Sequence, residues 1–198
     1  LKNIDTGINN EPPIRCFMPP TGEWKSLNDW PPPEARWTTF YLHKDRILSE
    51  HELWPAEGSD SFDESSFEHG SLTYATPLLV ENTEVLGPSV LTLYLSTTDI
   101  DALLFVTLLL IDRQGTEHEL TRGWLRASQR SLRGDSQPWE PVQSHEKREP
   151  LEPGKIYDLK IPIVPTARLF QAGERIAIRI GGGGGIDGAG AVLGDADG

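Results

Sequence analysis

The chain has 198 residues, which is enough for one domain with a substantial buried core. Its 16 prolines and 19 glycines suit an all-β chain with many turns better than a helical bundle. The net charge of −12 argues against binding to nucleic acid or to anionic lipid, because both present negative phosphates.

Cysteine content and hydropathy limit the chain further. Cys16 is the single cysteine, so no disulfide within the chain and no cysteine zinc cluster is expected. The longest apolar run, residues 102–111, is too short to span a bilayer. The chain begins with polar residues and no signal peptide, as an excised piece of a longer protein would. The compartment is not readable from the sequence, with the cytoplasm slightly favoured.

The first third of the chain is irregular in composition. Residues 1–10 are predicted to be a linker or the end of a helix, and residues 12–18 a short strand. Residues 24–33 are rich in tryptophan and include a triple proline, so an irregular, rigid connection is expected. Residues 36–42 are aromatic and β-branched, which favours a strand. The acidic stretch 43–70 is predicted to be mostly loop.

The middle of the chain alternates between apolar and polar residues. Residues 72–75 and 89–96 are predicted strands, with a short extended piece at 84–87. The continuous apolar run 102–111 fits a buried helix or a strand covered on both faces. Turn-forming residues on either side favour the strand, with residues 117–120 as the second arm of a hairpin.

The C-terminal third repeats the strand pattern. Residues 133–148 form a polar excursion, and residues 156–163 and 175–180 alternate as strands on either side of a proline-broken crossing segment. Many short strands with almost no helical period predict an antiparallel β-sandwich, and long excursions between strands favour a jelly roll. The glycine-rich tail, 181–198, is expected to be disordered.

No catalytic or metal-binding pattern is complete in the sequence. The G-x-S-x-G turn of α/β-hydrolases does not occur. His51, His118 and His145 each precede a glutamate, but none completes the H-E-x-x-H pattern of zinc proteases. Asp99 and Asp101 flank a turn, where capping of the backbone is favoured over calcium binding. We therefore predict no catalytic residue, no metal and no cofactor in this chain.

Tryptophan is abundant for this length. Exposed indoles on a sandwich can stack on sugar rings, as in carbohydrate-binding modules. Most of these indoles lie in or beside proline-rich connections, where packing against a rigid loop or at an interface is favoured. Both interpretations stay open. The six tryptophans are Trp24, Trp30, Trp37, Trp54, Trp124 and Trp139.

Several segments follow one another in a characteristic order over about residues 1–180. They are LKNIDTGINNEPPIRCFM, SLTYATPLLVENTEVLGPSVLTLYLST, GWLRAS and EPLEPGKIYDLKIPIVPTARLFQAGERIAIRI. The tryptophan–proline linker at Trp30 belongs to the same pattern. Together these segments resemble the C-terminal non-catalytic β-domain of the X-Pro dipeptidyl-peptidase and cocaine-esterase-like serine hydrolases.

The resemblance implies a jelly-roll sandwich of the galactose-binding-domain-like type with long loops. Residues 1–35 would link to a hydrolase domain missing from this chain and contribute one short strand. Residues 36–180 would form the sandwich, followed by the tail 181–198. The family's catalytic serine, aspartate and histidine lie in the hydrolase domain, so none is assigned here. Whether the chain should be called an enzyme is left open.

The resemblance also suggests a role for one loop. The loop before the strand at residues 72–75 would approach the substrate, so Phe62 and Phe67 are candidates for a wall of the substrate cleft. The alternative is that both are apolar anchors for an acidic loop. The expected partner is the α/β-hydrolase domain, and a homo-oligomer stays open. The competing functions are a free-standing carbohydrate-binding module and a purely structural interaction domain.

Overall fold

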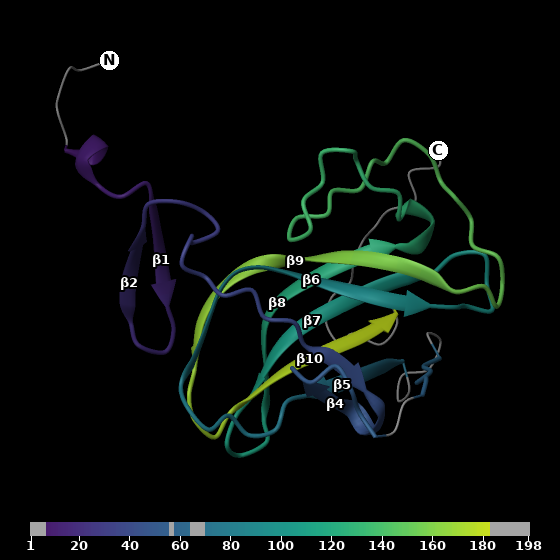
Figure 1. Cartoon of the computed structure of the whole chain (residues 1–198), viewed down its shortest axis with the longest axis horizontal. Coiled ribbons are helices and arrows are strands. Elements are labelled where there is room, and N and C mark those ends of the chain that lie inside the picture. Colours follow the sequence, from purple (N-terminus) through teal and green to yellow (C-terminus); the bar gives the residue numbers. More distant parts are fainter. Residues whose placement is uncertain (1–6, 56–57, 64–69, 183–198) are drawn as a thin grey trace.

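The computed structural model describes residues 7–55, 58–63 and 70–182 (Figure 1). These residues form ten β-strands and three short 3-10 turns, Ile8–Asn10, Lys44–Arg46 and Ala127–Gln129, and they contain no α-helix. The prediction of an all-β fold is therefore confirmed. The described part of the chain has no helix that is long and apolar enough to cross a membrane. Of the predicted tail 181–198, Gly181 and Gly182 are the last residues of a strand, Arg175–Gly182, and residues from 183 onward, like Phe67, lie outside the described residues.

The main sheet has eight strands in the order β3-β4-β5-β10-β7-β8-β9-β6. Neighbours pair antiparallel, except β4 and β5, which are parallel. The bounds of the strands are Tyr41–His43 for β3, Ile47–Ser49 for β4, Ser71–Ala75 for β5, Thr83–Leu95 for β6, Leu103–Ile111 for β7, Glu117–Arg126 for β8, Tyr157–Phe170 for β9 and Arg175–Gly182 for β10.

Strand β7 is the central strand of this sheet. It pairs with β8 on one side and with β10 on the other. Every residue from Leu104 to Leu110 is buried, whichever face its side chain occupies. A strand buried on both faces carries a continuous apolar run in place of alternation. The structure confirms that the run at residues 102–111 is such a strand and not a helix.

The sheet curls at the boundary between β8 and β9. These two strands are bridged at one residue pair, Gly123 with Ile163, whereas β9 pairs with β6 along most of its length. In Figure 1, β6 and β9 lie across β7, β8 and β10. Buried side chains from both parts, among them Leu159, Ile161, Val106 and Ile178, form one core. This is a β-sandwich, while its jelly-roll connectivity stays a prediction.

Two predicted breaks in the strands are absent. Strand β6 continues from Thr83 to Leu95, with irregular pairing between Gly87 and Ser89 where two separate pieces were expected. The predicted proline-broken crossing is wrong as well, because β9 runs through Pro162 and Pro165. Proline is tolerated where its missing N–H would not join a ladder. Strand β9 pairs with β6 on both sides of the irregularity, which leaves Val164 and Pro165 without partners in the register, and it has a single bridge to β8.

The segment before β5 also differs from its prediction. Residues 36–40 form no strand, and β3 begins only at Tyr41. Within the stretch predicted as loop, β3 turns back into β4 through Asp45 and Arg46, which both have φ of 63°. Left-handed residues in such turns are most often glycine or asparagine. Because neither residue type occurs there, the sequence carried no signal for this short hairpin.

A separate hairpin precedes the main sheet. It consists of β1 (Ile14–Met18) and β2 (Glu23–Leu27), paired antiparallel. Figure 1 shows it standing off from the sandwich. Strand β2 corrects the prediction that residues 24–33 are irregular throughout, since its own residues contain no proline. Lys25 of this hairpin forms an ion pair with Glu84 of β6, and the Leu169 N–H donates to the Pro19 carbonyl oxygen at 2.9 Å.

Candidate functional site

The loop that carries Phe62 lies against the main sheet. Phe62 is partly buried and packs against the hydrophobic core. The second candidate from the sequence, Phe67, lies outside the described residues. The contact of Phe62 with the core supports its interpretation as an anchor of the loop. Its predicted role as a wall of a substrate cleft stays a prediction.

A buried tyrosine holds the same loop from the neighbouring strand. The Tyr74 hydroxyl on β5 donates to Asp60 Oδ2 at 2.7 Å, and Arg46 Nη1 lies 3.2 Å from the same oxygen. The Arg46 guanidinium also lies 5.5 Å from the centre of the Tyr74 ring. Burial, followed by the hydrogen bond to Asp60, raises the pKa of Tyr74 to about 12. These contacts fix the position of the loop two residues before Phe62.

Two residues singled out in the sequence, His118 and Asp101, have side-chain partners. His118 Nε2 lies 2.8 Å from Asp112 Oδ2, and that hydrogen bond is the main cause of the lowered pKa of Asp112. Asp101 accepts hydrogen bonds from the Ala102 N–H and from both the N–H and the hydroxyl of Ser128. The predicted capping by Asp101 is confirmed. Within residues 7–55, 58–63 and 70–182, no group of three or more such side chains could hold a metal ion.

A groove lies between the two parts of the sandwich. Its volume is about 810 Å³. Strand β8, the proline-containing stretch of β9, the loop after β8 and the Trp30-Pro31 linker all contribute to its wall. We call it the tryptophan groove; its lining residues include Trp30, Trp124, Arg126, Gln129, Trp139 and Arg148.

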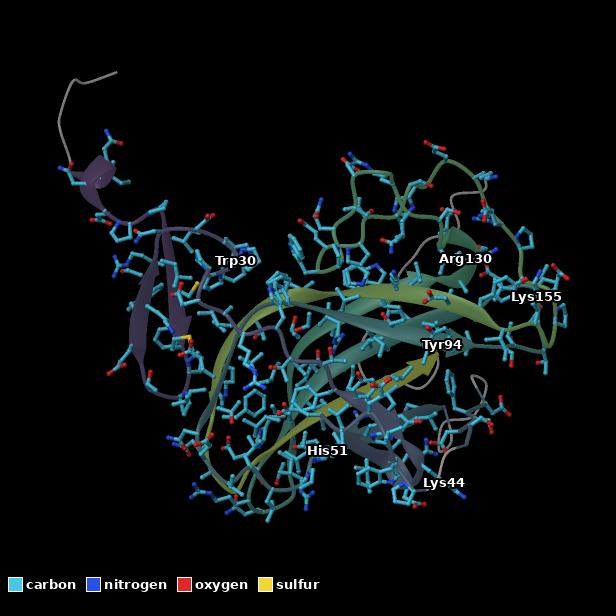
Figure 2. The ribbon with its side chains drawn as sticks, in the orientation of Figure 1. Trp30, Lys44, His51, Tyr94, Arg130 and Lys155 are labelled. Carbon is cyan, nitrogen blue, oxygen red and sulfur yellow. The ribbon has the colours of Figure 1, made fainter. Side chains whose placement is uncertain are left out.

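Three indoles from distant parts of the chain converge on the tryptophan groove. They are Trp30 from the linker, Trp124 from β8 and Trp139 from the loop. Figure 2 shows Trp30 between the N-terminal hairpin and the sandwich. Trp37 stacks on Trp139 with ring centres 5.8 Å apart and an angle of 30° between the planes. Packing roles are what the sequence favours for these residues, and their convergence leaves no trace in it, since no local pattern joins positions about ninety residues apart.

The exposure of the indoles is unusual for packing residues. Trp124 is 54% exposed and Trp37 is 57% exposed. Trp24, on the separate hairpin, is 59% exposed and packs against Phe17 with ring centres 5.5 Å apart. Of the three indoles that line the groove, Trp124 is exposed, while Trp30 and Trp139 are half-buried. Indole surface gathered in one concave site, rather than the exposure of any single side chain, indicates a binding surface.

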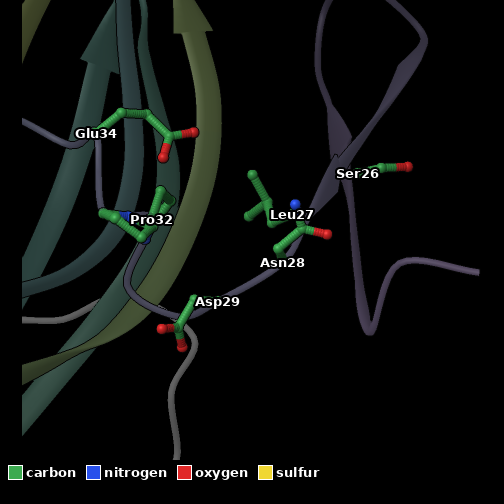
Figure 3. Close-up of a pocket in the computed structure, with 7 residues that line it drawn as sticks. Ser26, Leu27, Asn28, Asp29, Pro32 and Glu34 are labelled. Atoms are coloured by element: carbon green, nitrogen blue, oxygen red, sulfur yellow. The ribbon is translucent and has the colours of Figure 1, made fainter.

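A second, smaller hollow lies in the linker between the hairpin and the triple proline (Figure 3). Its volume is about 150 Å³, and Leu27, Asp29, Pro32 and Glu34 are among its lining residues. The Asp29 carboxylate accepts a hydrogen bond from the Trp30 N–H at 2.8 Å, which shapes the turn. This hollow is too small for most ligands, and we assign it to the packing of the linker.

Comparison with known proteins identifies the fold. A family model described as the X-Pro dipeptidyl-peptidase C-terminal non-catalytic domain matches residues 6–184. A CocE/NonD family hydrolase from Staphylococcus aureus has a similar structure, with a TM-score of 0.81 and 25% sequence identity over 92% of this chain and 35% of that one.

Two curated relatives are similar in sequence. A Mycobacterium bovis protein named as a serine esterase is 32% identical over 92% of this chain and 34% of its own length. A Bacillus anthracis protein named as a Xaa-Pro dipeptidyl-peptidase is 26% identical over 90% of this chain and 30% of its own length. The chain thus spans about a third of the length of these relatives. Because the family model covers nearly all of it, the chain belongs to the family of X-Pro dipeptidyl-peptidase C-terminal non-catalytic domains.

Proposed function

We propose that this chain is the accessory domain of a serine hydrolase that cleaves ester or X-Pro peptide bonds. In this role it packs against the hydrolase domain, which supplies the nucleophile, and helps to wall the substrate cleft. The observation that carries the proposal is the match of residues 6–184 to a non-catalytic domain. The relatives named as a serine esterase and as a Xaa-Pro dipeptidyl-peptidase support the two substrate classes.

The loop at residues 58–63 is the part proposed to face the substrate. A cleft wall has to be held in a fixed position, because binding geometry tolerates little displacement. The ion pair of Asp60 with Arg46 and its hydrogen bond from Tyr74 would provide this rigidity. Phe62 packs against the core but is not fully buried, so part of its ring can contact a ligand.

Hydrolysis assays test the proposal directly. The purified chain is expected to release no product from p-nitrophenyl esters or from aminoacyl-prolyl p-nitroanilides. Placed in the S. aureus hydrolase in exchange for the matching third, it is expected to restore activity that the truncated hydrolase lacks. Turnover by the chain alone that a serine-directed inhibitor abolishes would contradict the proposal. Full activity of the truncated hydrolase would contradict it equally.

The same chimera tests the role of Phe62. If Phe62 contacts substrate, Phe62→Ala raises KM or lowers kcat/KM about ten-fold at a temperature where the chimera stays folded. Phe62→Leu keeps the apolar contact with the core and serves as the matched control for stability. If Phe62→Ala lowers the unfolding midpoint but leaves the kinetic constants unchanged, Phe62 only anchors the loop. That result would refute its role in the wall of the substrate cleft.

A further inference from the structure

The tryptophan groove has the dimensions of a ligand site. Its volume of about 810 Å³ lies within the range of roughly 300–1,000 Å³ that small-molecule sites occupy. Surfaces on which proteins dock are usually flatter and bury a wide, shallow patch. The concave shape therefore favours an elongated small ligand over a folded partner.

The walls of the groove combine indole faces with planar polar groups. Trp30, Trp124 and Trp139 line it, and Trp37 extends the aromatic surface behind Trp139. Three glutamines, Gln129, Gln137 and Gln143, contribute amides to the same walls. A pyranose ring has an apolar face of C–H groups and an equatorial belt of hydroxyls. Indoles pack against the former, and side-chain amides and guanidinium groups bond to the latter.

One polar atom of the groove lacks a partner among the described residues. The side-chain oxygen of Gln129 is buried, and no described residue donates a hydrogen bond to it. A buried acceptor without a donor costs free energy, so its presence needs a reason. Rotation of the Gln129 amide would turn this oxygen into the groove, where a ligand hydroxyl can donate to it. Gln129 lies at the end of the turn that follows β8, and both it and Trp124 line the groove.

The charges of the groove favour a neutral ligand. Its titratable lining side chains are Arg126, Arg148, His145 and Glu140, so both signs are present. Arg126 already lies 3.6 Å from Asp101. The chain as a whole carries a net charge of −12, which repels a polyanion. A strongly anionic ligand would gain little here, whereas hydroxyl groups can bond to groups of either charge.

From these observations we infer that the tryptophan groove binds a short neutral oligosaccharide of pyranose units. This inference goes beyond the proposed accessory role and does not depend on it. Trp124 and Trp139 provide stacking faces, while Gln129 and Arg148 bond to ring hydroxyls. The sugar would be held by a domain that does no chemistry on it.

Isothermal titration calorimetry of the full chain tests this inference with cellohexaose, mannohexaose and xylohexaose, and with oligogalacturonate as an anionic counterpart. At least one neutral hexaose is expected to bind. Trp124→Ala is expected to weaken that binding about ten-fold, since it removes an aromatic contact. Trp24→Ala removes an equally exposed indole outside the groove and is expected to leave the affinity unchanged.

Gln129→Met gives a signature that a merely structural residue would not show. It replaces the unpartnered acceptor by an apolar side chain of similar length, so the free chain is expected to be as stable or more stable. Its affinity for the sugar is nevertheless expected to fall. Stability and binding thus change in opposite directions, and unfolding in urea measures the first.

Several outcomes would overturn the inference. They are a flat titration with every neutral sugar, binding of oligogalacturonate alone, and equal weakening by Trp24→Ala and Trp124→Ala. If Trp124→Ala does not fold, Arg148→Ala and Trp139→Ala are measured in its place. Unchanged affinity in both would also refute the site. Activity of the chimeric hydrolase is a separate readout, so failure of one proposal leaves the other standing.

Discussion

Tyr74 links a buried hydroxyl to the position of a loop. It is 6% exposed on β5, and it donates to Asp60, which also pairs with Arg46. Its pKa, raised to about 12 from the usual value of 10.0, means that the folded chain keeps the phenolic proton after the unfolded chain has lost it. The contribution of the protonated Tyr74 phenol to the stability of the folded chain is therefore fully present below pH 10. That contribution is lost as pH rises from 10 to about 12.

This linkage predicts how Tyr74→Phe changes the response to alkali. The variant loses a hydrogen bond and is expected to be about 1 kcal/mol less stable at pH 8. Between pH 10 and 12 the variant should lose less stability than the wild type, because it has no phenol to ionise. Urea unfolding across this range measures the difference. Tyr94→Phe, which changes an exposed tyrosine on β6, is the control. If Tyr74→Phe loses stability between pH 10 and 12 as steeply as the wild type, Tyr74 is not the group responsible.

At the scale of elements, the contact between β8 and β9 depends on one glycine. The two strands meet at the pair Gly123 and Ile163, where the sheet curls. A Cβ atom on residue 123 would lie 2.2 Å from the Pro162 carbonyl oxygen, which is far inside contact distance. Any larger residue has to push the two strands apart.

Gly123→Ala is therefore expected to destabilise the chain by about 1–3 kcal/mol, as overpacking of a tight contact does. Gly134→Ala is a matched control, because a Cβ at residue 134 would meet nothing within 4 Å. Its effect should stay within about 0.5 kcal/mol, as for most surface substitutions. Urea denaturation compares the two variants. Equal stabilities of Gly123→Ala and Gly134→Ala would show that β8 and β9 are not closely packed at residue 123.

At the scale of the whole molecule, one core joins both parts of the sandwich. Side chains from β4 through β10 belong to the same buried cluster. Phe170, Leu159 and Ile161 of β9 are fully buried in it, as are Leu104 and Val106 of β7. Neither part can separate without exposing the apolar surface of the other, which couples their unfolding.

A single cooperative transition is therefore expected on heating. Scanning calorimetry should give a calorimetric enthalpy equal to the van't Hoff enthalpy. Leu159→Ala should lower the stability by about 2–5 kcal/mol without splitting the transition. Leu53→Ala, at a side chain that is 85% exposed, is the control and should change little. Two resolved transitions in the wild type would refute a shared core.

Much of the fold was accessible from local pattern. The strands at residues 72–75, 89–96 and 175–180 were found because alternation has a period of two wherever one face of a sheet is buried. The β7–β8 hairpin was recognisable from an apolar run between turn residues. The sequence did not reveal the short pair β3–β4 or the continuity of β9 through its prolines. Left-handed turns of non-glycine residues and the pairing of an edge strand leave little trace in composition.

The sequence by itself determined the all-β class and the family, because strand periodicity and ordered segments are properties of the chain alone. Only the tertiary structure decided that Trp30, Trp124 and Trp139 share one groove and that Tyr74 reaches Asp60 and Arg46. The physical reason is distance along the chain. Local preferences act over a few residues, whereas these sites arise where the curled sheet brings together segments tens of residues apart.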